Sequence, residues 1–351
     1  MVQNPFDPLA FTQRLVELIE SGRRGSTYKL AVLVALIDIS VENDQAEDGT
    51  LTVPIGELAH HVVAYYWPQI RPYQNGKSLR QAYSNGKSIP QIIEKFVSSH
   101  PKLSSAESAK ESGHLEYLNM IRRFELLLAQ QPLAHFHTVA GRKTAFQENF
   151  LFDAQYFRKK MTRRELDQHR FVVLRPECAA TLRHNAILLK SYLTSVWLAD
   201  VRAMNKTQLD ADDLSDFLFG ATRANLLKTV TPLRLMQQNR CFYCSRELTG
   251  KVHVDHVIPW SRVPIDGLYN LVLSDQQCNL DKSASLPIRG HLDRALHRDG
   301  ADLAIVAAAS RLPLLHKRTM GAAMGIYRSL PDGFPLWSQA RMFEPYQLAD
   351  D

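Results

Sequence analysis

The sequence is poor in cysteine, with only Cys178, Cys241, Cys244 and Cys278 among 351 residues. Four cysteines, three of them clustered, are too few for the disulfide framework of a small secreted domain. A pair separated by two residues, with a third further along, instead indicates metal chemistry in a reducing compartment. Cys178 stands apart from the others, and we expect it to be an ordinary buried apolar side chain.

Long apolar runs are also missing. The strongest run, LAVLVALI at 30–37, is less than half of the ~20 residues that cross a bilayer, so it predicts a buried core helix. The N-terminal stretch MVQNPFDPLAF has an acid and two prolines where a signal peptide needs a basic segment and an apolar run. We therefore expect a soluble, cytoplasmic protein with no membrane partner.

The overall composition is that of a globular protein, with 45% apolar residues and enough length for two or three domains. The net charge of +6 and the pI of about 9.1 favour a polyanionic partner without identifying one.

The first 100 residues alternate between helical and strand patterns. Apolar residues at spacings of three and four predict two helices between positions 8 and 43, and residues 49–70 predict a strand followed by a helix. Another helix is expected at 88–99. This order resembles a winged-helix arrangement, in which one helix enters a DNA groove. The candidate wing is a β-hairpin over 132–153 that turns at 141–143; a helical domain with a small sheet is the alternative.

The middle of the chain combines further elements with a basic run. Residues 115–130 and 176–205 have helical patterns, and FVVL at 171–174 has that of a strand. Between them, YFRKKMTRRE (156–165) places five cations beside two aromatic residues, which suits contact with a nucleic-acid backbone. A solvated helix face is the alternative interpretation. The chain then turns from acidic to basic after residue 223, which predicts a domain boundary there.

Residues 240–287 read RCFYCSRELTGKVHVDHVIPWSRVPIDGLYNLVLSDQQCNLDKSASLP. They contain, in order, a Cys-x-x-Cys pair, a strand that ends in Asp-His, a second strand after an Asn, and a Cys-Asn pair. This pattern resembles the HNH (ββα-metal) endonuclease family. The resemblance covers about fifty residues and implies a compact unit of two strands and a helix around a catalytic metal.

The resemblance implies a role for each polar residue of the motif: His256 as general base, Asp255 and Asn279 as metal ligands, and Asn270 as the residue that holds the loop between the strands. The chemistry agrees with these roles. Phosphodiester hydrolysis needs a base that takes a proton from water and a cation that neutralises charge on the phosphate. Hard oxygen ligands such as carboxylate and amide suit Mg²⁺, or Mn²⁺ in its place.

A structural zinc site is expected beside the catalytic one. The family pattern has two Cys-x-x-Cys pairs, and here Cys241, Cys244 and Cys278 fit, whereas Asp275 occupies the fourth position. A Cys₃Asp site is chemically reasonable. The alternatives are that His253 or His291 replaces the fourth cysteine, or that the site has been lost.

Three other side chains near the motif are expected on helix surfaces. They are Lys282, with contact to a phosphate as the alternative, and His291 and His297.

We therefore expect an α+β protein with a mainly helical recognition or regulatory region at 1–222, an HNH nuclease domain at 223–300, and a helical extension at 301–351 that wraps it. The expected activity is metal-dependent cleavage of DNA, by analogy in bacterial restriction or phage defence. Two alternatives remain open: an effector whose N-terminal region senses a protein partner or small signal, and a catalytically silent DNA-binding module. Association into a homo-oligomer is also open.

Overall fold

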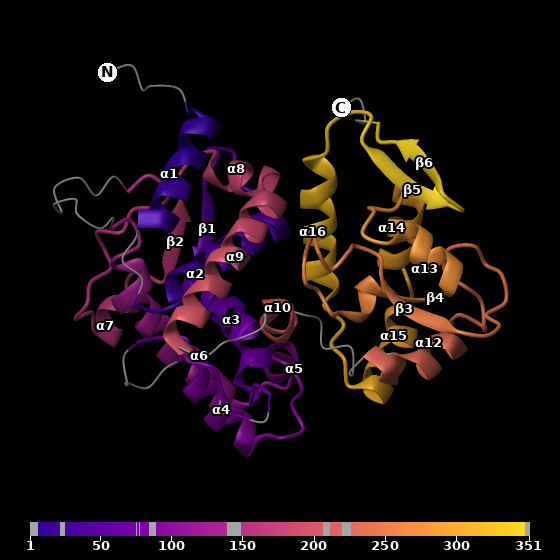
Figure 1. Ribbon diagram of the computed structural model, residues 1–351, viewed down its shortest axis with the longest axis horizontal. Coiled ribbons are helices and arrows are strands. Elements are labelled where there is room, and N and C mark those ends of the chain that lie inside the picture. Colours follow the sequence, from indigo (N-terminus) through magenta and orange to yellow (C-terminus); the bar gives the residue numbers. More distant parts are fainter. Residues whose placement is uncertain are drawn as a thin grey trace. The chain divides into compact units, whose positions relative to one another are not determined.

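The structure is a computed structural model of the chain, and the residues it describes are 6–21, 25–74, 76, 78–83, 89–138, 149–205, 211–219 and 226–347. The chain divides into two compact units, Met1–Gly220 and Ala221–Asp351 (Figure 1). Both combine helices with small antiparallel sheets, as expected for an α+β protein. Among the described helices, none is long and apolar enough to span a bilayer.

The first unit is mainly helical. Its α-helices are α1 (Pro8–Ser21), α2 (Tyr28–Glu42), α3 (Ile55–Tyr66), α4 (Ile89–Ser99), α5 (Ala106–Glu111), α6 (Leu115–Leu128), α7 (Arg163–Leu166), α8 (Cys178–His184), α9 (Ala186–Asn205) and α10 (Ala211–Phe219). The core is built around α2, which is buried from Leu30 to Glu42 and has α3, α8 and α9 packed against it (Figure 1). The apolar run at 30–37 is thus a core helix, as predicted.

A charged group lies inside this core. Asp38 on α2 is fully buried, and its Oδ1 accepts a hydrogen bond of 2.7 Å from Lys190 Nζ on α9, while Tyr65 donates to Oδ2. A buried carboxylate is tolerated only when it is paired and hydrogen-bonded. Cys178, at the start of α8, is also in the core, where it is 1% exposed and its thiol donates to the carbonyl oxygen of Phe150 at 3.5 Å.

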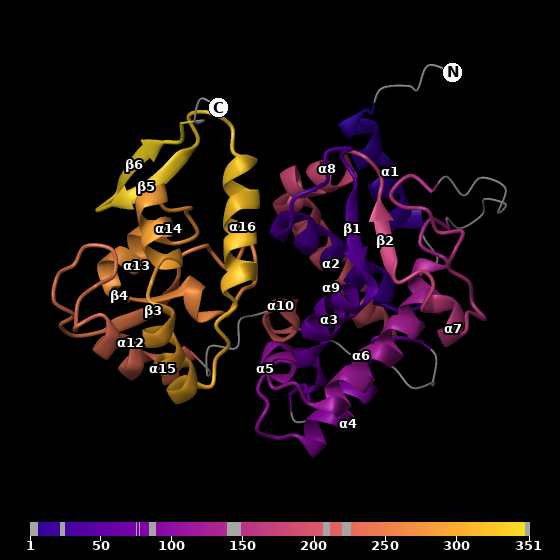
Figure 2. The same ribbon diagram turned by 180° about the vertical axis from the view of Figure 1, so that it is seen from behind.

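The sheet of the first unit differs from the prediction in its pairing. Strands β1 (Leu51–Pro54) and β2 (Phe171–Leu174) both form where expected, and they pair with each other in antiparallel register (Figure 2). The first arm of the predicted hairpin is not a strand, because Ala129–Leu133 form a π-helical turn and 134–138 are further turns. Phe136, in these turns, packs against Phe152, and their ring centroids lie 5.1 Å apart. The proposed hairpin tip, 141–143, lies outside the described residues.

The second unit contains short helices around two hairpins. Its elements are α12 (Val230–Met236), β3 (Val252–His256), β4 (Leu271–Asp275), α13 (Gln276–Lys282), α14 (Arg289–Leu296), α15 (Gly300–Ser310), α16 (His316–Arg328), β5 (Pro335–Gln339) and β6 (Met342–Pro345), with short 3₁₀ turns at Leu227–Thr229 and Leu268–Asn270. β3 pairs with β4, and β5 with β6, both antiparallel.

The sequence predicted a helical extension at 301–351, but this segment is not helical throughout. Helices α15 and α16 form, but β5 and β6 follow them. The main chain of Trp337 on β5 donates to Leu286 O and accepts from Ile288 N, at 2.8 and 2.9 Å, and its side chain is fully buried. These contacts with a segment fifty positions earlier hold the chain extended, and the helical pattern expected along 317–337 cannot reveal them.

Candidate active site and metal cluster

The candidate site is built on two strands and the helix that follows them. In the β3–β4 pair, Asp255 lies opposite Val272 and His256 opposite Leu271. Helix α13 begins directly after β4 and packs on both strands. Its start is fixed by Asp275, whose Oδ1 accepts a hydrogen bond of 2.8 Å from Cys278 N, since a carboxylate at this position satisfies a free backbone donor. The end of β3 is therefore held against α13.

Asp255 is almost buried, with 12% of its side chain exposed. Its Oδ2 accepts a hydrogen bond from the Tyr243 hydroxyl at 2.5 Å and lies 3.0 Å from Lys282 Nζ. Two donors on one oxygen fix the plane of the carboxylate. Oδ1 has no hydrogen-bond partner among the described residues, so it is the oxygen that Asp255 offers to a metal.

Lys282 corrects the sequence prediction. It was expected on a helix surface, but its side chain is fully buried, and Nζ also donates to the carbonyl oxygen of His256 at 2.7 Å. Burial lowers the pKa of Lys282, and the charge of Asp255 opposes that effect. The lysine is therefore an internal partner that joins α13 to the end of β3, where it fixes both Asp255 and the backbone of His256.

His256 is oriented by a residue that the sequence analysis missed. Its Nε2 lies 2.7 Å from Oδ1 of Asp266 in the loop between β3 and β4. The centroid of its ring lies 5.3 Å from that of Trp260. The carboxylate is an acceptor, so Nε2 carries the proton and Nδ1 remains available as an acceptor. The only signal in the sequence was an acid between the Asp-His pair and Asn270, and such acids are common in loops.

Asn279 lies on α13, three positions before Lys282, and residues at that spacing share a helix face. It is partly buried, and its side chain has no hydrogen-bond partner among the described residues. Since Lys282 on the same face reaches Asp255 and His256, Asn279 is carried on the side of α13 that packs toward the end of β3.

Asn270 is fully buried and closes the loop between the strands. Its Oδ1 accepts from Ile258 N at 2.8 Å, and its Nδ2 donates to the carbonyl oxygens of Ile258 and Ile265, both at 3.1 Å. Three hydrogen bonds across the loop 257–270 leave little freedom to the segment that carries Asp266.

The three clustered cysteines and Asp275 converge. The ligand atoms of Cys241, Cys244, Asp275 and Cys278 all lie within 4.8 Å of one another. The Cys278 thiol donates to Cys241 and lowers the pKa of Cys241 to about 6. Three sulfurs and one carboxylate are a donor set that fits a tetrahedral zinc ion. The described part of this unit thus contains a cluster able to bind a metal.

Neither alternative zinc ligand belongs to this cluster. His291 was expected on a helix surface, but it is buried. Its Nε2 forms a hydrogen bond of 2.6 Å with Ser338 O, and its ring packs near that of Trp337. His253 lies on β3, and its buried Nε2 has no hydrogen-bond partner among the described residues. His297 is exposed at the end of α14.

The basic run in the first unit consists of turns and the short helix α7, so it is not one continuous helix face. Arg158 pairs with Glu165, and Arg163 Nη2 lies 2.5 Å from Glu125 Oε2 on α6. These two cations are therefore partly neutralised. The other cations of the run are exposed and have no acidic partner in the described part of the chain: Lys159, Lys160 and Arg164.

A shallow groove of about 390 Å³ lies beside this run. Its lining residues are Asn119, Arg122, Arg123, Leu126 and Arg163. Arg122 and Arg123 are exposed on α6, and neither has an ion pair with a described residue. The groove and the run together form a basic face of the first unit.

Comparison with known proteins separates the two units. Residues 9–218 match the family model of a domain of unknown function, DUF8808. The chain belongs to this family. Residues 241–288 match the HNH endonuclease model. No curated protein and no solved structure matches the chain.

The DUF8808 match lies within the first unit, and the HNH match lies within the second. The HNH match contains the cysteine cluster, the Asp-His pair at the end of β3, Asn270 and Asn279. The second unit therefore contains an HNH endonuclease domain, which places the protein among the nuclease hydrolases.

Proposed function

We propose that this DUF8808-family protein is a metal-dependent endonuclease that hydrolyses DNA phosphodiester bonds at the end of β3 and on the adjoining face of α13. The observation that carries the proposal is the arrangement of Asp255, His256 and Lys282. One contact network orients the carboxylate and the backbone of the histidine at the same point of an HNH domain.

His256 acts as the general base. Asp266 holds the proton on Nε2, so Nδ1 takes the proton from the attacking water. Asp266 is a positioning residue, because it keeps the imidazole in the tautomer and orientation that the reaction needs. Asn270 supports it by fixing the loop on which it lies.

Asp255 and Asn279 hold the catalytic cation, Mg²⁺ or Mn²⁺, through one carboxylate and one amide oxygen. Such hard oxygen ligands leave most of the coordination sphere to water and phosphate. When bound, the ion neutralises charge that develops on the phosphate and the leaving oxygen. Lys282 and Tyr243 keep Oδ2 of Asp255 occupied and so present Oδ1 to the ion.

The Cys241, Cys244, Asp275 and Cys278 cluster holds a structural zinc ion. An HNH unit is small, and a metal that joins the segment before β3 to the start of α13 supplies stability that a small core lacks. This zinc takes no part in the reaction.

The basic face of the first unit contacts the DNA backbone. The ββα unit itself offers little readout of base sequence, so selection of the target belongs to the first unit. A role in bacterial restriction or phage defence follows from analogy with nucleases that join a recognition region to an HNH domain. The ion pairs of Arg158 and Arg163 favour the second candidate, an effector whose first unit senses a partner, because they remove charge from the DNA-binding run.

The proposal is tested by incubating the protein with plasmid DNA and Mg²⁺, with and without EDTA. Cleavage should require the metal, and His256→Ala should reduce the rate by ~10²- to 10⁴-fold with DNA affinity preserved, because a general base acts on the transition state. His297→Ala, an exposed histidine of the same unit, is the matched control. Near wild-type cleavage by folded His256→Ala protein contradicts the assignment.

A further inference from the structure

Three side chains with metal-binding groups meet in the first unit. His100 follows the end of α4, His114 is the residue before the first turn of α6, and Glu116 lies in that turn. Their ligand atoms all lie within 4.8 Å of one another. His100 is partly buried, and the other two are exposed.

The ring of His100 is already oriented for a ligand. Its Nδ1 bonds to the carbonyl oxygen of Phe96 at 3.0 Å, and the ring stacks on the Phe96 ring with centroids 4.4 Å apart. The carbonyl accepts the proton on Nδ1, so Nε2 is the acceptor nitrogen. Histidines that bind metals typically donate their other N–H to a carbonyl or carboxylate in this way.

His114 is fixed by its backbone. Its carbonyl oxygen accepts from the N–H groups of Tyr117 and Leu118 as α6 begins, yet its side chain does not cap the helix. The His114 ring lies 5.1 Å from that of His100, and it has no hydrogen-bond partner among the described residues. The site therefore offers three ligands to a cation. They are one acceptor nitrogen from each of the two adjacent imidazole rings and an oxygen of the Glu116 carboxylate.

We propose that His100, His114 and Glu116 bind a divalent transition-metal ion, with Zn²⁺ as the best fit and water in the remaining positions. Two imidazole nitrogens select Zn²⁺, Co²⁺ or Ni²⁺ over Mg²⁺ and Ca²⁺, which prefer oxygen ligands. Bonds of about 2.0 to 2.2 Å draw the three ligand atoms closer together, and the two exposed side chains are able to move by that amount. The negative charge of Glu116 offsets the unfavourable effect of a cation near a helix N-terminus.

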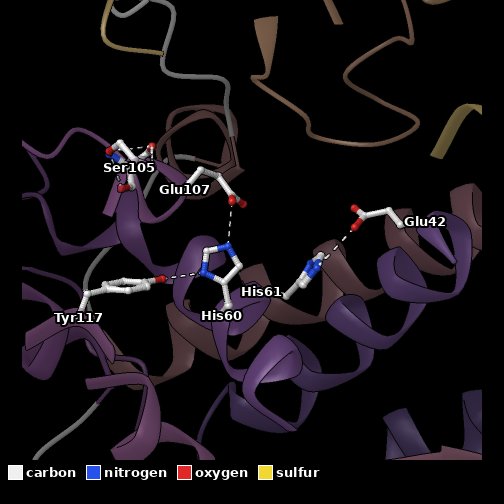
Figure 3. Close-up of polar contacts among 7 residues, drawn as sticks. Glu42, His60, His61, Ser105, Glu107 and Tyr117 are labelled. Atoms are coloured by element: carbon white, nitrogen blue, oxygen red, sulfur yellow. Dashed lines mark hydrogen bonds and ion pairs between the residues drawn. The ribbon is translucent and has the colours of Figure 1, made fainter. Parts of the chain in front are cut away.

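The ion joins the end of α4 to the start of α6 and so closes the segment 100–116, which contains α5. Helix α5 carries Glu107, whose Oε2 lies 2.8 Å from His60 Nε2, while His60 Nδ1 bonds to the Tyr117 hydroxyl at 2.6 Å (Figure 3). Phe96, on which His100 stacks, also contacts the Tyr117 ring at 5.6 Å. Metal binding therefore stabilises the segment that carries Glu107 and the start of α6, which carries Tyr117, and these are the two partners of the buried His60.

This site uses no residue of the HNH domain, so it is tested independently of nuclease activity. The full-length protein is purified with its cysteine cluster loaded with zinc. It is titrated with Co²⁺ in excess Mg²⁺, which occupies the proposed site at Asp255 and Asn279, and binding is followed by calorimetry and visible absorption. We expect one additional cobalt per chain, with d–d absorption but without the near-ultraviolet charge-transfer band that thiolate ligands produce. Zn²⁺ should compete for the same site and raise the thermal unfolding temperature of the first unit.

His114→Ala and Glu116→Gln should each weaken Co²⁺ binding by ~10-fold or more, since even residues that support metal ligands contribute 10- to 100-fold. Both side chains are exposed, so circular dichroism should show an unchanged fold. His184→Ala, an exposed histidine on α8 whose Nδ1 also bonds to a backbone carbonyl, is the control and should bind as the wild type does. Absence of the additional cobalt in the wild-type protein, or wild-type binding by a variant that carries both His114→Ala and Glu116→Gln, overturns the proposal.

Discussion

In the second unit, the candidate active site comes from one continuous stretch, 241–282, and the bond from Lys282 to the His256 carbonyl spans 26 positions. In the first unit, His60 meets Tyr117 across 57 positions, and Lys190 meets Asp38 across 152. A motif is visible along the chain only where its members are close in sequence. The second unit could therefore be interpreted before its fold was known, whereas the polar networks of the first unit could not.

Each unit contains a buried ion pair, and the two pairs differ in whether they lie beside a residue proposed to take part in catalysis. The Asp38–Lys190 pair lies in the core of the first unit, and neither residue adjoins a group with a proposed chemical role. The Asp255–Lys282 pair lies beside the proposed base. Disruption of the first pair should affect stability alone, and disruption of the second should affect stability and catalysis together.

The largest effect is expected from loss of the cysteine cluster. Cys241→Ser should remove about one zinc per chain, unfold the second unit at a lower temperature and abolish cleavage, because structural zinc binding contributes directly to folding free energy. Metal analysis and thermal unfolding measure both changes. Cys178→Ala, in the core of the first unit, should retain the zinc. A Cys241→Ser protein with unchanged zinc content shows that this cluster is not the site.

Lys282→Met should destabilise the second unit by about 3 to 5 kcal/mol and greatly reduce cleavage, because it leaves Asp255 nearly buried without its ionic partner. Urea unfolding measures the stability change, with exposed Lys251→Met as the control. Lys190→Met should destabilise the first unit by a similar mechanism, but the folded protein should cleave DNA at the wild-type rate. Equal losses of activity in both variants would contradict the claim that only the Asp255–Lys282 pair supports catalysis.

Asp266→Asn should lower kcat by ~10- to 100-fold, less than loss of the base itself, which contributes ~10² to 10⁴. The amide keeps the size of the side chain but no longer holds the proton on Nε2 of His256 in the same way. KM and zinc content should not change, as steady-state kinetics and metal analysis would show. An unaltered kcat means that Asp266 only packs against the histidine.

Substitutions on the basic face are expected to have the smallest effect. They should leave folding unchanged and weaken only DNA binding. Conversion of Arg122, Arg123, Lys159, Lys160 and Arg164 to Gln should weaken DNA binding and lower the log–log salt slope by ~0.9 for each phosphate that the protein no longer neutralises. Exposed Lys102 and Lys110, changed to Gln together, are the control. Wild-type affinity and slope in the first variant favour the effector alternative.

The sequence was sufficient where local pattern and short separation decide the outcome. Buried α2 follows from the apolar run at 30–37, β1 and β2 follow from short alternating segments, and the spacing from Cys241 to Asn279 predicted the HNH domain that the family model matches. Asp275 was expected beside the three cysteines, and its ligand atom does lie among theirs. In these cases each side chain depends mainly on its neighbours along the chain.

The predictions that failed depended on long-range contacts. The first arm of the hairpin expected at 132–153 begins in a π-helical turn, and the contacts of Trp337 with 286–288 made a strand where a helix was expected. Burial of Lys282 and the bond between Asp266 and His256 also appear only when a helix and a loop pack on β3.

The HNH domain could be identified from the order of residues alone, because its cysteines, its Asp-His pair and Asn279 lie within one short segment. Three features required the folded chain: the free oxygen of Asp255, the protonated nitrogen of His256, and the convergence of His100, His114 and Glu116. These features depend on the positions of individual side-chain atoms, and those positions are set only when separate elements pack closely against one another.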